Sequence, residues 1–163
     1  MKLLAAGGIG KRIMRNNRRR GSQFVEAGLM MLPFLALVFM TMDAGWAVFV
    51  KATLQHAVRE GVRYGVTGLV APNDGQAASI EAITIRQAMG LLDSQQETLH
   101  VQYLDPVTFA PSSNAGGNIV QVSVTNYMIT PLAPLLRSGN AIPVNVTAAD
   151  VIEGSPNGVP PAP

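Results

Sequence analysis

The sequence predicts an α+β protein: a long N-terminal transmembrane helix that extends into a small domain with a second helix and a short antiparallel sheet. Three observations predict this fold class. An apolar run near the N-terminus is long enough to cross a bilayer, and the segment after it keeps a helical spacing of apolar and polar residues. In the C-terminal half, short stretches alternate between apolar and polar residues, as half-buried strands do. The length of 163 residues allows one ordinary domain, or a small domain plus a membrane segment.

The charged residues are few and unevenly placed. Only 13% of the residues are charged, against ~25% in an average globular protein, and 48% are hydrophobic. Residues 1–20 contain seven of the 12 Lys and Arg residues and none of the ten acidic residues. A basic arm directly before an apolar run is a signal of membrane topology, which argues against nucleic acid as a partner. We therefore predict that residues 1–21 form a basic leader that stays in the cytoplasm.

The apolar run covers residues 27–50 and contains a single charged residue, Asp43. A helix of that length spans ~36 Å, enough for a hydrocarbon core of ~30 Å. A cleaved secretory signal is the competing interpretation, but its apolar region has only ~7–15 residues. We predict a retained span, in which Pro33 kinks or locally unwinds the helix because proline has no amide hydrogen.

The helix is predicted to continue beyond the membrane and to cover residues 22–66 in total. In its last third, polar and apolar residues each recur every four positions and so occupy two separate faces. The polar face carries Lys51, Gln55, Arg59 and Arg63, and the apolar face carries Val50, Leu54, Val58 and Val62. We expect the apolar face to pack on the domain that follows.

That domain is predicted over residues 67–152, outside the cytoplasm. It should contain a second helix at about 76–92 with Asp74 as its N-terminal cap. Alternating stretches predict three strands, at residues 98–103, 120–125 and 142–147. Asp105 and Pro106 indicate a turn, and residues 107–110 are considered as an extension of a strand. The last segment, 153–163, is rich in Pro and Gly and is predicted to be a disordered tail.

The residue types available for chemistry are limited. The absence of cysteine excludes a disulfide framework, a thiolate nucleophile and cysteine-based metal sites, and only two histidines are present. The sequence contains no nucleophile motif and no phosphate-binding loop. We therefore expect no catalytic residue, no cofactor and no metal ion.

A small residue and a carboxylate stand at the entrance of the apolar run. A carboxylate inside a membrane helix costs ~2.5–3.5 kcal/mol, so Glu26 either lies at the headgroup level or has a partner. A protease at the membrane surface could cut after Gly21, which would give Ser22 a new α-ammonium one helical turn from Glu26. In a bundle of such helices, the Glu26 carboxylate of one subunit can then meet the Ser22 ammonium of another. Gly21, Ser22 and Glu26 are thus the predicted processing residues.

Further along the helix, Asp43 lies ~25 Å beyond Glu26. It either marks the exit from the membrane or makes a contact between helices. The candidate helix–helix contacts are Glu26, Asp43, Arg59, Glu60 and Arg63.

Several short motifs in residues 20–67 occur together in one known family. The motifs are Gly21-Ser22 after basic residues, Val25-Glu26, Leu32-Pro33, an acidic residue before Gly45, and the stretch LQHAVREGVRYG at 54–65. This segment resembles the TadE-type pseudopilins of tight-adherence (Tad/Flp) pilus systems, and the last stretch resembles that family's AxREGxRYA helix. The sequence departs from the family at Ala27, where an aromatic residue is usual, and at Trp46, where an arginine is common.

The resemblance implies a non-enzymatic, minor pilin-like subunit that a prepilin peptidase processes after Gly21. Such a subunit would act in pilus assembly at the bacterial inner membrane, with its N-terminus in the cytoplasm. Its implied partners are other pilin or pseudopilin subunits, pilus assembly platform proteins and the lipid bilayer. Two alternatives remain: a generic single-pass membrane protein whose outer domain binds a ligand or a partner, and an exported protein with an unusually long signal.

Overall fold

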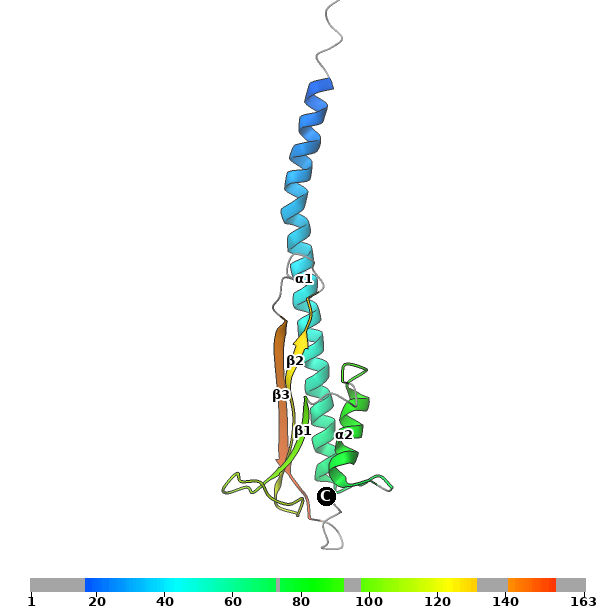
Figure 1. Cartoon of the computed structure of the whole chain (residues 1–163), viewed down its shortest axis with the longest axis vertical. Coiled ribbons are helices and arrows are strands. Elements are labelled where there is room, and N and C mark those ends of the chain that lie inside the picture. Colours follow the sequence, from blue (N-terminus) through cyan, green and yellow to red (C-terminus); the bar gives the residue numbers. More distant parts are fainter. Residues whose placement is uncertain (1–16, 73, 93–97, 132–140, 155–163) are drawn as a thin grey trace, which may run out of the picture. The chain divides into compact units, whose positions relative to one another are not determined.

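A computed structural model describes residues 17–72, 74–92, 98–131 and 141–154 of the chain. Within them, two helices and three strands follow one another in the order α1, α2, β1, β2, β3 (Figure 1). This confirms the predicted α+β class, with a long apolar N-terminal helix, a second helix and a three-stranded antiparallel sheet. Most of the predicted leader and most of the predicted tail lie outside the described residues. The chain divides into two units, residues 1–41 and 42–163.

The described part of the first unit is the N-terminal half of α1, which spans Asn17–Val66. The helix begins five residues before its predicted start and remains helical on both sides of Pro33, so the proline does not unwind it. Thr41 Oγ1 donates a hydrogen bond of 2.9 Å to the Leu37 carbonyl, which keeps this hydroxyl satisfied within the helix. Among the described residues, α1 is the one helix that is long and apolar enough to cross a membrane.

The second unit is built around the C-terminal half of α1. The predicted apolar face is buried, with exposures of 1% at Val50, 0% at Leu54 and Val58, and 5% at Val62. These side chains pack in one cluster with inward-facing residues of the sheet and of α2, because each of these elements has one apolar side to cover. Most of the predicted polar face of α1 stays exposed.

The sheet has the strand order β1-β2-β3, and both pairs are antiparallel. The strands are β1 (Leu99–Leu104), β2 (Ile119–Ile129) and β3 (Ile142–Val151). A bulge interrupts the β2–β3 ladder between Val124 and Tyr127. Asn126 in this bulge has a φ of 56°, and its backbone N–H donates to Asn145 Oδ1 at 2.7 Å. The Asn145 side chain thus accepts the hydrogen bond that the backbone of Asn126 cannot make within the ladder.

The connection after β1 corrects the expectation of a strand at residues 107–110. Asp105 Oδ1 accepts hydrogen bonds from the backbone N–H groups of Val107 at 2.9 Å and Thr108 at 2.8 Å. The bonds from Thr108 and Val107 hold the pKa of the Asp105 carboxyl below its ordinary value. These two N–H groups bond to the carboxylate and not to a neighbouring strand, so this segment is a turn.

The second helix, α2, spans Gln76–Gln87 and is shorter than predicted at its C-terminal end. Its N-cap is Gly75, and no side chain caps it, so the prediction of Asp74 as the cap is wrong. The helix stops because Met89 and Gly90 adopt positive φ angles of 54° and 81°.

Two glycines allow α1 to lie close to α2. A Cβ added at Gly61 would collide with Thr84 Oγ1 of α2. A Cβ added at Gly65 would lie 2.8 Å from Ile80 Cδ1 of α2 and 3.2 Å from Val120 Cγ2 of β2. The side chains of α2 therefore fill the space that these glycines leave.

A buried glutamine joins both helices, one strand and a loop of the second unit. Gln76 at the start of α2 has an exposure of 0%. Its Nε2 donates to the Gly65 carbonyl of α1 at 3.0 Å. Its Oε1 accepts hydrogen bonds from Asn114 Nδ2 at 2.8 Å and from the Tyr103 hydroxyl at 3.3 Å. Because every polar atom of the amide side chain has a partner, Gln76 can be buried among apolar groups at low cost.

Candidate functional site

The predicted processing residues lie on the exposed surface of α1 in the first unit. Gly21 has nothing within 4 Å of the position where a Cβ would be, so the backbone there is open to a partner. Ser22 Oγ donates a hydrogen bond to Glu26 Oε1 at 3.4 Å, across one helical turn. The structure thus brings residues 22 and 26 together on one face of the helix.

The peptide bond after Gly21 is inside a helix in the full chain, because α1 begins at Asn17. A glycine in a helix interior costs about 1 kcal/mol relative to alanine, so this turn is easier to unwind than its neighbours. Easy unwinding is favourable for a peptidase, which needs the backbone in an extended form. The sequence had predicted the helix only from residue 22.

The other predicted contact residues belong to the second unit. Asp43 is half-buried. Arg59 and Arg63 are exposed and Glu60 is half-buried on the part of α1 that packs on the sheet. Within the described part of the chain, none of the last three residues forms an ion pair.

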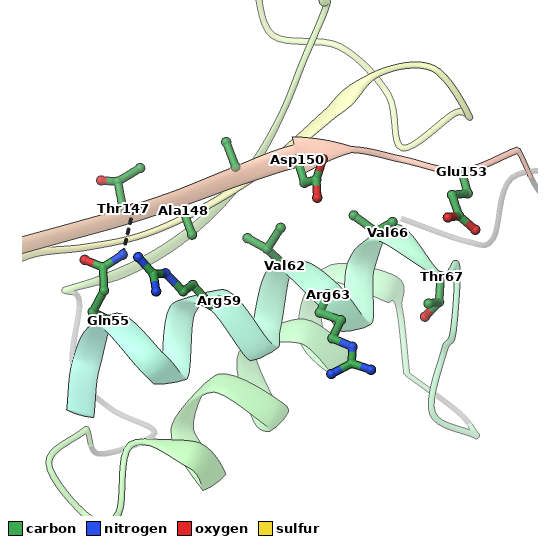
Figure 2. A pocket seen from close by; sticks show the side chains of 11 residues that line it. Gln55, Arg59, Val62, Arg63, Val66, Thr67, Thr147, Ala148, Asp150 and Glu153 are labelled. Carbon is green, nitrogen blue, oxygen red and sulfur yellow. Dashed lines mark hydrogen bonds between the residues drawn. The ribbon is translucent and has the colours of Figure 1, made fainter. Parts of the chain in front are cut away.

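A groove of about 640 Å³ runs between α1 and β3 in the second unit (Figure 2). Apolar side chains form part of its wall, and polar or charged side chains from both elements surround them. Its lining residues are Gln55, Arg59, Val62, Arg63, Val66, Thr67, Thr147, Ala148, Ala149, Asp150 and Glu153. Figure 2 shows Arg59 reaching toward Ala148, whereas Arg63 points away from the strand. The groove thus carries cations on its helix side and the carboxylates of Asp150 and Glu153 on its strand side.

The groove lies along the free edge of β3, the last strand in the sheet order. Two side chains cover backbone groups of this edge. Gln55 Nε2 donates to the Thr147 carbonyl at 3.3 Å, and Asp150 Oδ1 accepts the Val151 N–H at 2.8 Å. Such bonds protect an edge strand against unwanted pairing. Sequence reasoning identified Arg59 and Arg63 but missed this groove, because the strand order that creates its far wall has no signal in the sequence.

Comparison with known proteins identifies one part of the chain. The model of the TadE-like protein family matches residues 21–63. The matched segment begins at Gly21 and ends at Arg63, so it contains all of the predicted processing and contact residues. No curated protein and no solved structure matches the chain. The resemblance to the TadE-type pseudopilins is therefore confirmed over this segment.

Proposed function

We propose that this chain, whose residues 21–63 match the model of the TadE-like family, is a minor pilin-like subunit of a Tad/Flp-type pilus. In this proposal a prepilin peptidase cuts after Gly21, and the mature subunit joins other pilin-like subunits through α1. The observation that carries the proposal is the placement of Ser22 and Glu26 on one helix face, with 3.4 Å between their side-chain oxygens.

Cleavage would change the electrostatics of the helix start. An α-ammonium on Ser22 would stand at the positive end of the helix dipole, which is unfavourable without an anion nearby. The Glu26 carboxylate, one turn away, would supply that anion within the same subunit or in a neighbour. Removal of residues 1–21 would also remove seven cations from the membrane surface. These two effects support a role for processing as the step that releases the helix for assembly.

The proposed location is the bacterial inner membrane, with residues 1–21 in the cytoplasm and the second unit outside it. The seven basic residues before the span support this orientation, because positive segments remain on the cytoplasmic side. The exposed Arg59 and Arg63 would then face other subunits or assembly platform proteins outside the cytoplasm.

Replacement of Gly21 by tryptophan tests the processing step. A bulky side chain at this position should block the peptidase, and mass spectrometry of the membrane fraction should find a precursor that is heavier by the 21 residues of the leader. The matched control is Gly28→Trp, because Gly28 lies on the same helix and also has nothing within 4 Å of its Cβ position. The control should be cut between Gly21 and Ser22, and normal processing of Gly21→Trp would contradict the proposal.

The groove beside β3 favours one other function, a single-pass membrane protein whose outer domain binds a ligand or a partner. The N-terminal residue of the mature protein separates these two functions from each other and from an exported protein. Ser22 supports the pilin-like subunit, Met1 supports the generic membrane protein, and a start beyond about residue 47 supports an exported protein with a long signal.

A further inference from the structure

In the second unit, the core begins close to the N-terminal end of this unit's part of α1. Trp46 and Phe49 stack on each other, with ring centroids 5.5 Å apart, and remain 37% and 48% exposed. Ala47 lies between them and already packs against the core, and Val50, directly after Phe49, is 1% exposed. The distance along the helix from Trp46 to Val50 is ~6 Å. An aromatic pair of this kind is typical of the membrane interface, so the core begins about one helical turn from that interface.

The strand β3 runs beside α1 and in the same direction (Figure 1). Two hydrogen bonds fix the alignment: Gln55 Nε2 to the Thr147 carbonyl, and the Glu153 N–H to the Val66 carbonyl at 3.1 Å. Between these two points α1 rises by ~17 Å and β3 by ~20 Å, so the two elements stay aligned along this length. Five residues before Thr147, Ile142 therefore lies ~17 Å back in the direction of the N-terminus of α1, level with the turn that holds Trp46.

The end of the sheet at this level is apolar and exposed. Ile142 pairs with Ile129 in the last rung of the β2–β3 ladder, and Met128 pairs in the rung before it. Met128 is 56% exposed and Ile142 is 49% exposed. We call the four exposed apolar residues at this level of the second unit the apolar rim: Trp46, Phe49, Met128 and Ile142.

We propose that this apolar rim contacts the lipid bilayer, so that the end of the sheet rests in the headgroup layer of the membrane that α1 crosses. The rim is continuous with the span through Trp46 and Phe49, which is why lipid is the occupant. The exposed Lys51 stands two residues after Phe49. It can place its ammonium among anionic headgroups while its aliphatic stem covers apolar surface. The sheet end cannot lie in the hydrocarbon core. As an edge strand, β3 has backbone groups that need water as a hydrogen-bond partner, and the hydrocarbon core contains no water. This contact is independent of processing and of pilus assembly.

Nitroxide labels on single cysteines test the contact. The chain has no cysteine, so Met128→Cys and Ile142→Cys each give one labelled position in the otherwise unchanged full chain. Val107→Cys and Phe109→Cys are the controls, because these side chains are 83% and 66% exposed and follow β1 at the opposite end of the sheet. In phosphatidylcholine–phosphatidylglycerol vesicles, labels at 128 and 142 should collide with a water-soluble nickel chelate several-fold less often than labels at 107 and 109. Their collisions with oxygen, which dissolves in lipid, should rise in the same comparison.

The outcomes separate the rim from the span. Trp46 is the sole tryptophan, so quenching of its fluorescence by brominated lipids reports insertion of α1 in each labelled variant. Quenched Trp46 with equal chelate access at all four labels would overturn the lipid contact alone. Labels at 128 and 142 that neither chelate nor oxygen reaches would indicate a protein partner on the rim and would also overturn it. Unquenched Trp46 in every variant would overturn the span and the rim contact together.

Discussion

Glu26 is the sole ionised side chain between Gly21 and Asp43, and a carboxylate at the entrance of an apolar helix needs compensation. Removing its charge should make insertion of the helix easier rather than harder. We therefore predict that Glu26→Gln leaves a membrane-inserted and processed protein that no longer supports piliation. If the pair of Glu26 and the Ser22 ammonium is buried in the assembled pilus, the change should weaken assembly by about 3–5 kcal/mol, the usual effect of removing one partner from a buried charge pair.

Processing by mass spectrometry and pilus counts by electron microscopy measure the two effects of Glu26→Gln separately. Gln23→Ala is the matched control, because Gln23 is exposed on the same part of α1 and carries no charge. Wild-type piliation in Glu26→Gln would show that the carboxylate is incidental. A loss of processing would instead assign it to recognition by the peptidase.

Tyr103 provides a pH-dependent test of the buried network around Gln76. Burial raises the pKa of Tyr103 from its ordinary value of 10.0 to about 12. Between these values the unfolded chain has released the phenol proton while the folded chain still holds it, so rising pH favours unfolding. The stabilising contribution is complete below the unfolded pKa and is lost as the pH rises through the folded pKa.

We predict that the thermal midpoint of the detergent-solubilised protein falls more steeply above about pH 10 in the wild type than in Tyr103→Phe. Circular dichroism melts at several pH values measure this slope. Tyr64→Phe controls for the loss of a tyrosine elsewhere in the second unit. Parallel curves for wild type and Tyr103→Phe would contradict the proposed role of Tyr103.

At the scale of elements, the close approach of α1 and α2 depends on the missing side chain at Gly61. We predict that Gly61→Ala destabilises the protein by about 1–3 kcal/mol, because its Cβ would collide with Thr84 Oγ1 and force the helices apart. Alanine is the better helix former by about 1 kcal/mol, so any loss must come from the contact between the helices.

Thermal melts of two further variants identify the cause of that loss. Gly45→Ala is the matched control on the same helix, since nothing lies within 4 Å of its Cβ position, and it should be neutral or stabilising. In a Thr84→Ala background, Gly61→Ala should lose most of its cost. An equal cost in both backgrounds would show that the collision with Thr84 is not the reason.

The elements with a clear period could be predicted from the sequence. The four-residue spacing from Val50 to Val62 identified the buried face of α1, and alternation located all three strands, because each pattern reports which side of one element is buried. The candidate residues Arg59 and Arg63 were found on the opposite face for the same reason.

Features that depend on another element could not be predicted. Thr84 and Gln76 are polar and yet fully buried, because Gly61 and the Gly65 carbonyl of α1 meet them there. The turn at Asp105 and Pro106 was predicted, but residues 107–110 were considered as an extension of a strand, because the bonds that Asp105 Oδ1 accepts from the following amides are not visible in the local pattern. In both cases the decisive partner is absent from the local pattern.

For the whole molecule, the uneven distribution of charge is the signal for orientation. Seven basic residues precede the span, whereas Lys51, Arg59 and Arg63 are the basic residues within ~20 positions after it. Processing after Gly21 would remove all seven, so the orientation has to be set before the leader is cut. We therefore predict that a C-terminal fusion of a reporter that is active only outside the cytoplasm gives full activity in the wild type.

The orientation signal can be removed without touching the three arginines next to Gly21. Replacement of Lys2, Lys11, Arg12 and Arg15 by glutamine leaves three basic residues before the span, equal to the three that follow it. Since the difference in Lys and Arg determines orientation, this variant should insert both ways and lose a large share of the reporter activity. Immunoblots for the fusion control for its amount. A stable wild-type fusion without activity would place the second unit in the cytoplasm and contradict the proposed orientation, and full activity in the variant would show that the leader charges do not set it.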